Sequence, residues 1–233
     1  MANGVDLTIV MPFYNERPTL RTALERLLKA PLSLAFEVIL VDDGSTDGSA
    51  ETVADLVDGS RVRLLEHARN KGKGAAIRTG VAEARGGLLS ILDADLEYDP
   101  ANIEQLIGAV HQHGAKVVYG VRSFGAHTAY SFWFVIGNRM LSLWTSFLFN
   151  VWVRDIETCL KMMPVEVWRG LDLKSRGFGV EAETTAKLLK RRHRIFEVPI
   201  DYMARTREEG KKLSWKDGVQ ALWLILRIRV VGR

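Results

Sequence analysis

The sequence predicts an α/β protein whose mostly parallel central sheet is flanked by helices on both faces. Short apolar runs rich in β-branched residues alternate with segments in which apolar residues recur at helical spacing. Polar, carboxylate-rich stretches directly follow several of these runs. Because ligands of parallel sheets bind beyond the carboxyl ends of the strands, these stretches mark one candidate binding edge.

Five apolar runs predict the strands, because each is short, nearly continuous and bounded by polar or turn-forming residues. They cover residues 7–11, 36–41, 62–65, 88–92 and 117–119. Helical spacing predicts the intervening segments as helices, two of them opened by prolines, which are favoured in a first helical turn. These helices begin at Pro18, near 50–57, near 75–84 and at Pro100.

Length and composition restrict the class of protein. A chain of 233 residues with 47% hydrophobic and 26% charged residues is typical of one globular domain. A single cysteine, Cys159, excludes a disulfide scaffold and a cysteine-based zinc site. The N-terminus has no basic stretch before a long apolar run, so we expect no signal peptide.

Two acidic motifs follow predicted strands. Asp42 and Asp43 can accept hydrogen bonds from a base or a ribose, although a helix cap after a tight turn would also use an aspartate. Asp93, Asp95 and Glu97 lie within five residues and repel one another unless a cation is present. Such oxygen ligands suit Mg²⁺ or Mn²⁺ bridged to phosphates, whereas the alternative is a solvated acidic loop.

Residues 70–74, Asn-Lys-Gly-Lys-Gly, form a third motif. The segment lacks the Gly-Lys-Ser/Thr ending of a phosphate-binding P-loop. We interpret it as a basic turn into a helix, with Lys73 as the candidate to approach a phosphate. A solvated turn is the alternative.

These motifs and Pro12-Phe-Tyr-Asn-Glu16, in this order, resemble the family-2 nucleotide-sugar glycosyltransferases of the GT-A fold, a Rossmann-like architecture. The resemblance implies that the Pro-x-Tyr-Asn-Glu and Asp-Asp-Gly-Ser segments hold the nucleoside and that the Asp-x-Asp segment holds metal and diphosphate. The implied donor-binding residues are Pro12, Tyr14, Glu16, Asp42, Asp43, Lys73, Asp93, Ala94 and Asp95. It also implies Mg²⁺ or Mn²⁺ on Asp95 and Glu97, where many relatives carry Gln at the second position.

The segments 177–183, 198–202 and 205–218 extend the resemblance to the bacterial branch of the polyprenyl-phosphate sugar synthases, relatives of dolichol-phosphate mannose synthase. In those enzymes a basic loop covers the donor diphosphate, which implies donor contacts for Arg205 and Lys211; a solvated basic loop is the alternative. We therefore expect one glycosyltransferase domain, with residues 1–123 binding the nucleotide sugar and residues 124–233 binding the acceptor.

The resemblance implies inverting transfer of a sugar to a polyprenyl phosphate, with GDP-mannose favoured and a UDP-sugar as the other donor. Arg122 and Arg139 are candidates for the acceptor phosphate, because guanidinium groups make forked bonds to phosphate. Asp155 is a candidate base and, with Asp95, a candidate catalytic residue. One alternative is transfer from a UDP-sugar to a glycan hydroxyl. The other is an inactive nucleotide-sugar-binding or scaffold protein, and the presence of Asp93, Asp95 and Glu97 argues against this second alternative.

Residues 128–153 carry eight aromatic side chains and one charge, Arg139. Arg139 divides this stretch into two uncharged pieces, each too short to span a membrane. We expect helices on the membrane surface with Trp133, Trp144 and Trp152 at the headgroups, or else a core or dimer face.

An amphipathic helix is expected over 215–231. Its apolar positions are Val219, Leu222, Trp223, Leu226 and Val230, and Arg227, Arg229 and Arg233 suit anionic headgroups.

Charge is divided unevenly along the chain. Residues 1–153 hold 14 basic and 17 acidic residues, a net −3, and residues 154–233 hold 18 and 11, a net +7. The basic C-terminal part fits phosphates and a membrane surface, and the acidic motifs argue against nucleic acid as a partner. We expect a cytoplasmic protein, peripheral at the cytoplasmic face of the membrane, with a homodimer or a membrane-anchored partner both compatible with the sequence.

Overall fold

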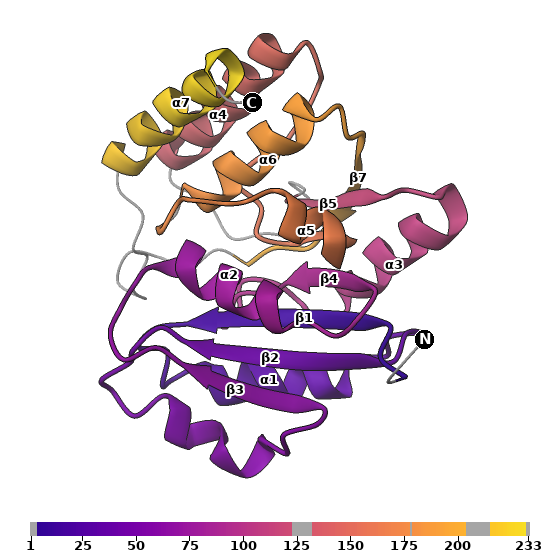
Figure 1. Cartoon of the computed structure of the whole chain (residues 1–233), viewed down its shortest axis with the longest axis vertical. Helices are drawn as coiled ribbons and strands as arrows, with labels where there is room; N and C mark the ends of the chain where they lie inside the picture. Colours follow the sequence, from indigo (N-terminus) through magenta and orange to yellow (C-terminus); the bar gives the residue numbers. More distant parts are fainter. Residues whose placement is uncertain (1–3, 123–131, 178, 204–214, 232–233) are drawn as a thin grey trace.

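The computed structural model describes residues 4–122, 132–177, 179–203 and 215–231. Its centre is a seven-stranded mixed sheet. Its strand order is β3-β2-β1-β4-β6-β5-β7 (Figure 1). The strands are β1 Leu7–Phe13, β2 Phe36–Asp42, β3 Val62–Glu66, β4 Leu88–Ile91, β5 Val117–Arg122, β6 Lys161–Pro164 and β7 Ile195–Ile200. The helices are α1 Leu20–Lys29, η1 Ala50–Leu56, α2 Lys73–Glu83, α3 Asn102–His113, α4 Phe132–Phe149, α5 Val165–Gly170, α6 Val180–Lys190 and α7 Trp215–Val230.

One strand runs against the others. Strand β6 pairs antiparallel with both β4 and β5, whereas the remaining pairs are parallel. Four residues are too few to show a strand period, so the sequence did not reveal β6. Because β6 is reversed, the residues that lead into it, 155–160, lie at the carboxyl ends of β4 and β5. This reversal brings a segment from the C-terminal half to the predicted binding edge.

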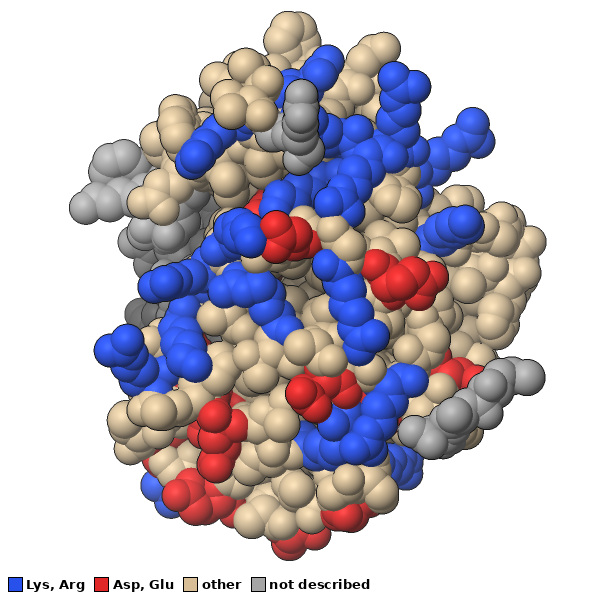
Figure 2. All heavy atoms as spheres, viewed as in Figure 1, with Lys and Arg blue, Asp and Glu red and all other residues tan. Residues whose placement is uncertain are grey.

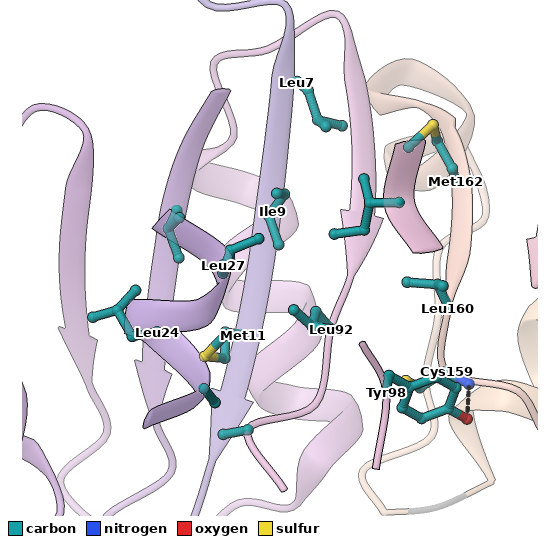
Figure 3. Packing of buried hydrophobic residues seen from close by; sticks show 14 of the residues in the cluster. Leu7, Ile9, Met11, Leu24, Leu27, Leu92, Tyr98, Cys159, Leu160 and Met162 are labelled. Atoms are coloured by element: carbon teal, nitrogen blue, oxygen red, sulfur yellow. Dashed lines mark hydrogen bonds between the residues drawn. The ribbon is translucent and has the colours of Figure 1, made fainter. Parts of the chain in front are cut away.

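The two faces of the sheet are covered by separate layers of apolar side chains. Leu7, Ile9 and Met11 of β1 pack with α1 and α3 in one cluster, and Figure 3 shows Leu24 and Leu27 of α1 against them. The residues between them in β1 face the other way, as a strand's alternation requires. On that second face α2, α5 and α6 cover the sheet, and Figure 1 shows α2 in front of it and α1 behind.

A third cluster joins the helices of the C-terminal half. Helix α7 packs against α4 and α6 through Ala221, Ile225 and Ile228, which recur at helical spacing and are buried (Figure 1). Of the residues expected as the apolar face, Leu222 packs against this cluster, whereas Val219, Trp223, Leu226 and Val230 are exposed. Helix α7 therefore has two apolar faces, one packed on the protein and one turned outward.

The tryptophans expected at the headgroups differ in environment. Trp152 is 71% exposed, whereas Trp144 is half-buried and donates its indole N–H to the carbonyl of Leu222 at 3.2 Å. For Trp144 the structure agrees with the packing alternative, because its ring contributes to the packing of α4 on α7, and its position at the headgroups stays a prediction. The side chain of Trp133 lies outside the part of the chain that is described.

The helix expected near 50–57 is a 3₁₀-helix, η1. Within it Val53 is buried, so little packing is available to favour a longer α-helix. The hydroxyl of Thr52 also donates to the carbonyl of Ser49 at 2.6 Å, which tightens the turn.

Two helical glycines provide a matched stability test. A Cβ on Gly80 of α2 would lie 2.4 Å from Val10 of β1, whereas a Cβ on Gly108 of α3 would meet Gln112 at 3.7 Å. We expect Gly80→Ala to lower the free energy of unfolding by about 1–3 kcal/mol through overpacking. Gly108→Ala should raise it by about 0.5–1 kcal/mol, the helix preference of Ala over Gly. Urea unfolding measures both, and a Gly80→Ala variant as stable as wild type would contradict the close packing of α2.

Candidate active site

The loops that follow β1 and β2 hold one another at the carboxyl edge of the sheet. Asn15 adopts a left-handed conformation with φ 52° and accepts a hydrogen bond from the amide of Thr46 at 2.9 Å. Its own amide donates to the hydroxyl of Ser45 at 3.0 Å, and the amide of Ser45 donates to Asp42 at 2.7 Å. These hydrogen bonds hold the residues predicted to bind the nucleoside along the carboxyl edge of the sheet. They are Pro12, Tyr14, Glu16 and Asp42.

Asp43 has an internal role in the same region. It is buried, and its carboxylate accepts hydrogen bonds from the amides of Lys71 at 2.9 Å and Gly72 at 2.7 Å. The imidazole of His67 contacts it at 2.7 Å and reaches Thr79 at 2.9 Å on its other side. Asp43 therefore holds the turn before α2, and its predicted contact with the donor stays a prediction.

The N-terminus of α2 is closed by the protein itself. The carbonyl of Arg176 accepts hydrogen bonds from the amides of Gly74 at 2.6 Å and Ala75 at 3.3 Å. A Cβ at Gly72, where φ is 93°, would lie 2.4 Å from that carbonyl, so the close approach needs glycine. The helix end that the sequence suggested for a phosphate thus contacts the 171–177 segment in this structure.

Lys73 lies between two carboxylates. Its ammonium is 2.7 Å from Asp93 and 2.8 Å from Glu181 of α6. Burial alone would lower the pKa of Lys73, but the two carboxylates outweigh burial and hold that pKa well above its ordinary value. In this arrangement Lys73 neutralises the acidic motif and joins the two halves of the chain, a role that sequence reasoning missed.

The acidic loop after β4 has a bent backbone. Leu96 has a φ of 62°, and the amide of Glu97 donates to Asp95 at 3.1 Å. The hydroxyl of Tyr202 donates to the carboxylate of Glu97, and the amide of Met203 donates to the Glu97 carbonyl at 2.9 Å. Residues after β7 therefore buttress this loop.

The carboxylate oxygens of this loop suit Mg²⁺ or Mn²⁺ as ligands. Asp95 and Glu97 are half-buried carboxylates, hard oxygen ligands of the type that these ions prefer. Within the described residues no three Asp, Glu, His or Cys side chains converge as a closed metal site. A Mg²⁺ or Mn²⁺ ion held by this pair would take its remaining ligands from phosphate and water.

Beneath the loop lies a buried charged network. Lys161 of β6 is 1% exposed, and its ammonium donates to the carbonyls of Ile156 at 2.9 Å and Thr158 at 2.7 Å. One carboxylate oxygen each of Glu157 and Glu181 is buried without a protein hydrogen-bond partner. Burial and the charge of Glu181 raise the pKa of Glu157 to about 7, and burial lowers the pKa of Lys161 to about 8.

A cavity of about 570 Å³ opens next to this edge, between β5, α4 and β7. Arg122 and Asp155 line it and form a two-pronged ion pair, with N–O distances of 2.7 Å on both prongs. Burial would raise the pKa of Asp155, but Arg122 outweighs burial and lowers that pKa below its ordinary value. The structure thus pairs two residues to which the sequence gave separate roles, and an ion-paired carboxylate of low pKa is a weak base.

The other predicted phosphate ligands are divided between described and undescribed parts. Arg139 of α4 is exposed and lines the same cavity as Arg122, as do the apolar side chains Val135, Leu143 and Trp152. Arg205 and Lys211 lie outside the described residues. Lysine and arginine side chains gather over the middle and upper part of the face in Figure 2, above the more acidic N-terminal end.

The sequence profile described as Glycosyl transferase family 2 matches residues 8–162. This stretch is more than half of the chain and includes the loops after β1, β2 and β4. The chain belongs to glycosyl transferase family 2.

Curated relatives transfer sugars to lipid phosphates, according to their names. The chain is 43% identical over 127 residues to an undecaprenyl-phosphate 4-deoxy-4-formamido-L-arabinose transferase of Aeromonas hydrophila, covering 52% of this chain and 39% of the relative. It is 27% identical over 212 residues to a dolichol-phosphate mannosyltransferase of Pyrococcus furiosus, covering 88% and 58%. It is 34% identical over 123 residues to a dodecaprenyl-phosphate galacturonate synthase of Rhizobium johnstonii, covering 51% and 36%. The chain therefore spans less than two thirds of the length of each of these relatives.

Solved structures show the fold. A glucosyl-3-phosphoglycerate synthase of Mycobacterium tuberculosis, crystallised with Mn²⁺, UDP and phosphoglyceric acid, superposes with a TM-score of 0.75 at 19% identity, covering 98% of this chain and 80% of that one. The predicted GT-A fold of this family-2 chain is thus confirmed.

The buried network predicts a pH dependence of stability. Because the pKa of Glu157 is raised, the folded chain holds more protons than the unfolded chain between about pH 4.5 and 7. The free energy of unfolding should therefore fall as the pH rises through this window, by at most about 1.4 kcal/mol per pH unit.

Glu157→Gln should flatten this fall, because the amide does not titrate. Urea unfolding near pH 5 and near pH 7.5 compares the two, with the exposed Glu51→Gln as a control that keeps the wild-type slope. Equal slopes in wild type and Glu157→Gln would show that Glu157 does not titrate in this range.

Proposed function

We propose that this family-2 chain transfers a sugar from a nucleotide sugar to a polyprenyl monophosphate, with inversion at the anomeric carbon. The observation that supports it best is the position of the cavity, which lies beside the acidic loop and has apolar side chains and three arginines, Arg122, Arg139 and Arg154, in its wall. Arginine suits a phosphate, and apolar walls suit a lipid tail. The names of the curated relatives agree with a lipid-phosphate acceptor.

For the donor we propose GDP-mannose, with a UDP-sugar as the alternative. The relative that is aligned over 88% of this chain is named for mannosyl transfer. Other relatives are named for the transfer of formamido-arabinose and galacturonate. The donor would lie along the edge formed by Pro12, Tyr14, Glu16 and Asp42, with its diphosphate toward Asp95.

The chain's own residues provide the chemistry at each end of the transferred sugar. Asp95 and Glu97 would hold Mg²⁺ or Mn²⁺, which supplies positive charge for the leaving diphosphate. Arg139 would orient the acceptor phosphate so that its oxygen forms a bond to the anomeric carbon as the bond to the nucleoside diphosphate breaks. A phosphomonoester has a second pKa near 6 and is largely a dianion at neutral pH. The low pKa of Asp155 is therefore compatible with this acceptor, which needs no strong base.

We also propose that the protein works at a membrane surface, on the cytoplasmic side. Helices α4 and α7 lie side by side and expose large apolar side chains close to the cavity. These are Phe132, Met140, Leu143, Phe147, Val219, Trp223, Leu226 and Val230. Among the described residues no helix is both long and apolar enough to cross a bilayer. This surface would instead lie in the interface, with the cavity open toward the lipid.

A direct assay tests the function. The full chain is incubated with Mn²⁺ or Mg²⁺, a polyprenyl phosphate in detergent and a panel of GDP- and UDP-sugars, and lipid-linked sugar is followed by mass spectrometry. We expect a sugar phosphate lipid with one donor, no product with chelator, and the opposite anomeric configuration in the product. Extension of a glycan without any lipid product would support the hydroxyl acceptor, and the absence of turnover with either acceptor would support the inactive protein.

Arg139→Ala tests the acceptor site. Loss of a charge-assisted hydrogen bond to the phosphate should raise the KM for polyprenyl phosphate about tenfold or more, with the KM for the donor unchanged. Arg26→Ala on the exposed face of α1 removes the same charge far from the cavity and should keep the wild-type KM. Equal KM values for the lipid in both variants would contradict the site.

Asp155→Asn separates a phosphate acceptor from a hydroxyl acceptor. If Asp155 serves to hold Arg122, the rate should fall by less than about a hundredfold, without a change in the acidic limb of the pH–rate profile. If Asp155 is a general base, its replacement should lower the rate by up to about 10⁴-fold, and the acidic limb of the pH–rate profile should disappear. The second result would replace the lipid phosphate by a hydroxyl acceptor.

A further inference from the structure

Tyr202 connects two parts of the site that lie on different elements. It follows β7 by two residues, and its hydroxyl donates to the carboxylate of Glu97 in the loop after β4. Its ring also lines the cavity that contains Arg122 and Asp155. The residue is 3% exposed, so both contacts are made inside the protein.

The backbone fixes Tyr202 in this place. Tyr98 and Tyr202 form an antiparallel β-bridge, and the amide of Met203 donates to the carbonyl of Glu97 at 2.9 Å. The rings of Tyr98 and Tyr202 pack with their centroids 4.9 Å apart. The bridge and the ring contact leave the phenol of Tyr202 little freedom to leave Glu97. The hydroxyl of Tyr98 makes a separate contact, because it accepts a hydrogen bond from the amide of Cys159 at 3.3 Å (Figure 3).

The ring of Tyr202 faces the cation of the acceptor cavity. The guanidinium of Arg122 lies over this ring, 5.1 Å from its centroid, while its N–H groups bind Asp155. A guanidinium over an aromatic face is attracted by the ring's negative face. One side chain thus supports Arg122 with its face and Glu97 with its hydroxyl.

A carboxylate that binds a metal depends on the groups that orient it. A phenol has one proton to donate and a carboxylate can only accept, so the hydroxyl of Tyr202 holds one oxygen of Glu97 and leaves the direction of the other defined. Partners of this kind typically change metal affinity 10–100-fold when removed. We propose that Tyr202 is a positioning residue that orients Glu97 as a metal ligand from the wall of the acceptor cavity. The inference rests on the proposed function, in which Glu97 holds Mg²⁺ or Mn²⁺.

Tyr202→Phe isolates the hydroxyl, because it keeps the ring under Arg122 and in the cavity wall. Binding of Mn²⁺ is measured on the full chain with GDP or UDP present, from the electron paramagnetic resonance signal of free Mn²⁺. We expect the Kd for Mn²⁺ to rise about tenfold or more. In the lipid assay the KM for Mn²⁺ should rise in parallel, while the KM for polyprenyl phosphate stays within about twofold.

Tyr98→Phe is the matched control. It removes a hydroxyl from the neighbouring ring, which contacts Cys159 and not Glu97 through that oxygen, so the Kd for Mn²⁺ should stay at the wild-type value. Tyr202→Leu should raise both the Kd for Mn²⁺ and the KM for polyprenyl phosphate, because the ring is lost as well. An effect of equal size in Tyr98→Phe and Tyr202→Phe would overturn the inference in favour of a general loss of packing.

A double-mutant cycle tests whether Tyr202 acts through Glu97. In a Glu97→Ala background, Tyr202→Phe should cause no further loss of Mn²⁺ affinity, whereas independent effects would add. Additive losses, or a Tyr202→Phe variant that binds Mn²⁺ as wild type does, would overturn the inference alone. A wild-type chain that binds no Mn²⁺ with either nucleotide would overturn the metal-dependent function and the inference with it.

Discussion

The ammonium of Lys73, held between Asp93 and Glu181, is the interaction on which the rest of the site depends. Asp93 belongs to the loop after β4 and Glu181 to the start of α6, so one buried cation fastens the acidic motif to the C-terminal half. A buried ion pair stabilises only when every charge in it is matched, and removal of one partner typically costs about 3–5 kcal/mol. The arrangement of the acidic loop at the carboxyl edge of the sheet therefore depends on the pairing of Lys73 with one carboxylate from each half of the chain.

The same principle appears at the cavity between β5, α4 and β7. The carboxylate of Asp155 satisfies Arg122 through two short hydrogen bonds, and the ring of Tyr202 supports the guanidinium from its face. These contacts order one arginine of the cavity and keep a carboxylate ionised there. The two ion pairs, Lys73 with its carboxylates and Arg122 with Asp155, lie on opposite sides of the reversed strand β6 in the sheet order, so that the segment before this strand lies between the acidic loop and the cavity.

The helices of the C-terminal half combine two tasks. The buried face of α7 joins α4 and α6 through small and branched side chains, and its other apolar face is left outward. Arg229 anchors the end of this helix by donating to the carbonyl of Leu148 at 2.8 Å. The outward apolar face of this helix is exposed to water, which is unfavourable. Binding to a membrane surface would remove this apolar area from water.

Local sequence was sufficient for the strands of the N-terminal half and for the acidic motifs at their ends, because those signals reside in runs of consecutive residues. It also indicated the family, since four motifs occur in the required order. Tertiary structure alone revealed the ion pairs of Lys73, Arg122 and Asp155, because their partners lie 20 to 108 residues away in the chain. It alone revealed β6, Glu157, Lys161 and Tyr202, since a reversed four-residue strand has no period to detect and a phenol contact across 105 residues leaves no local pattern.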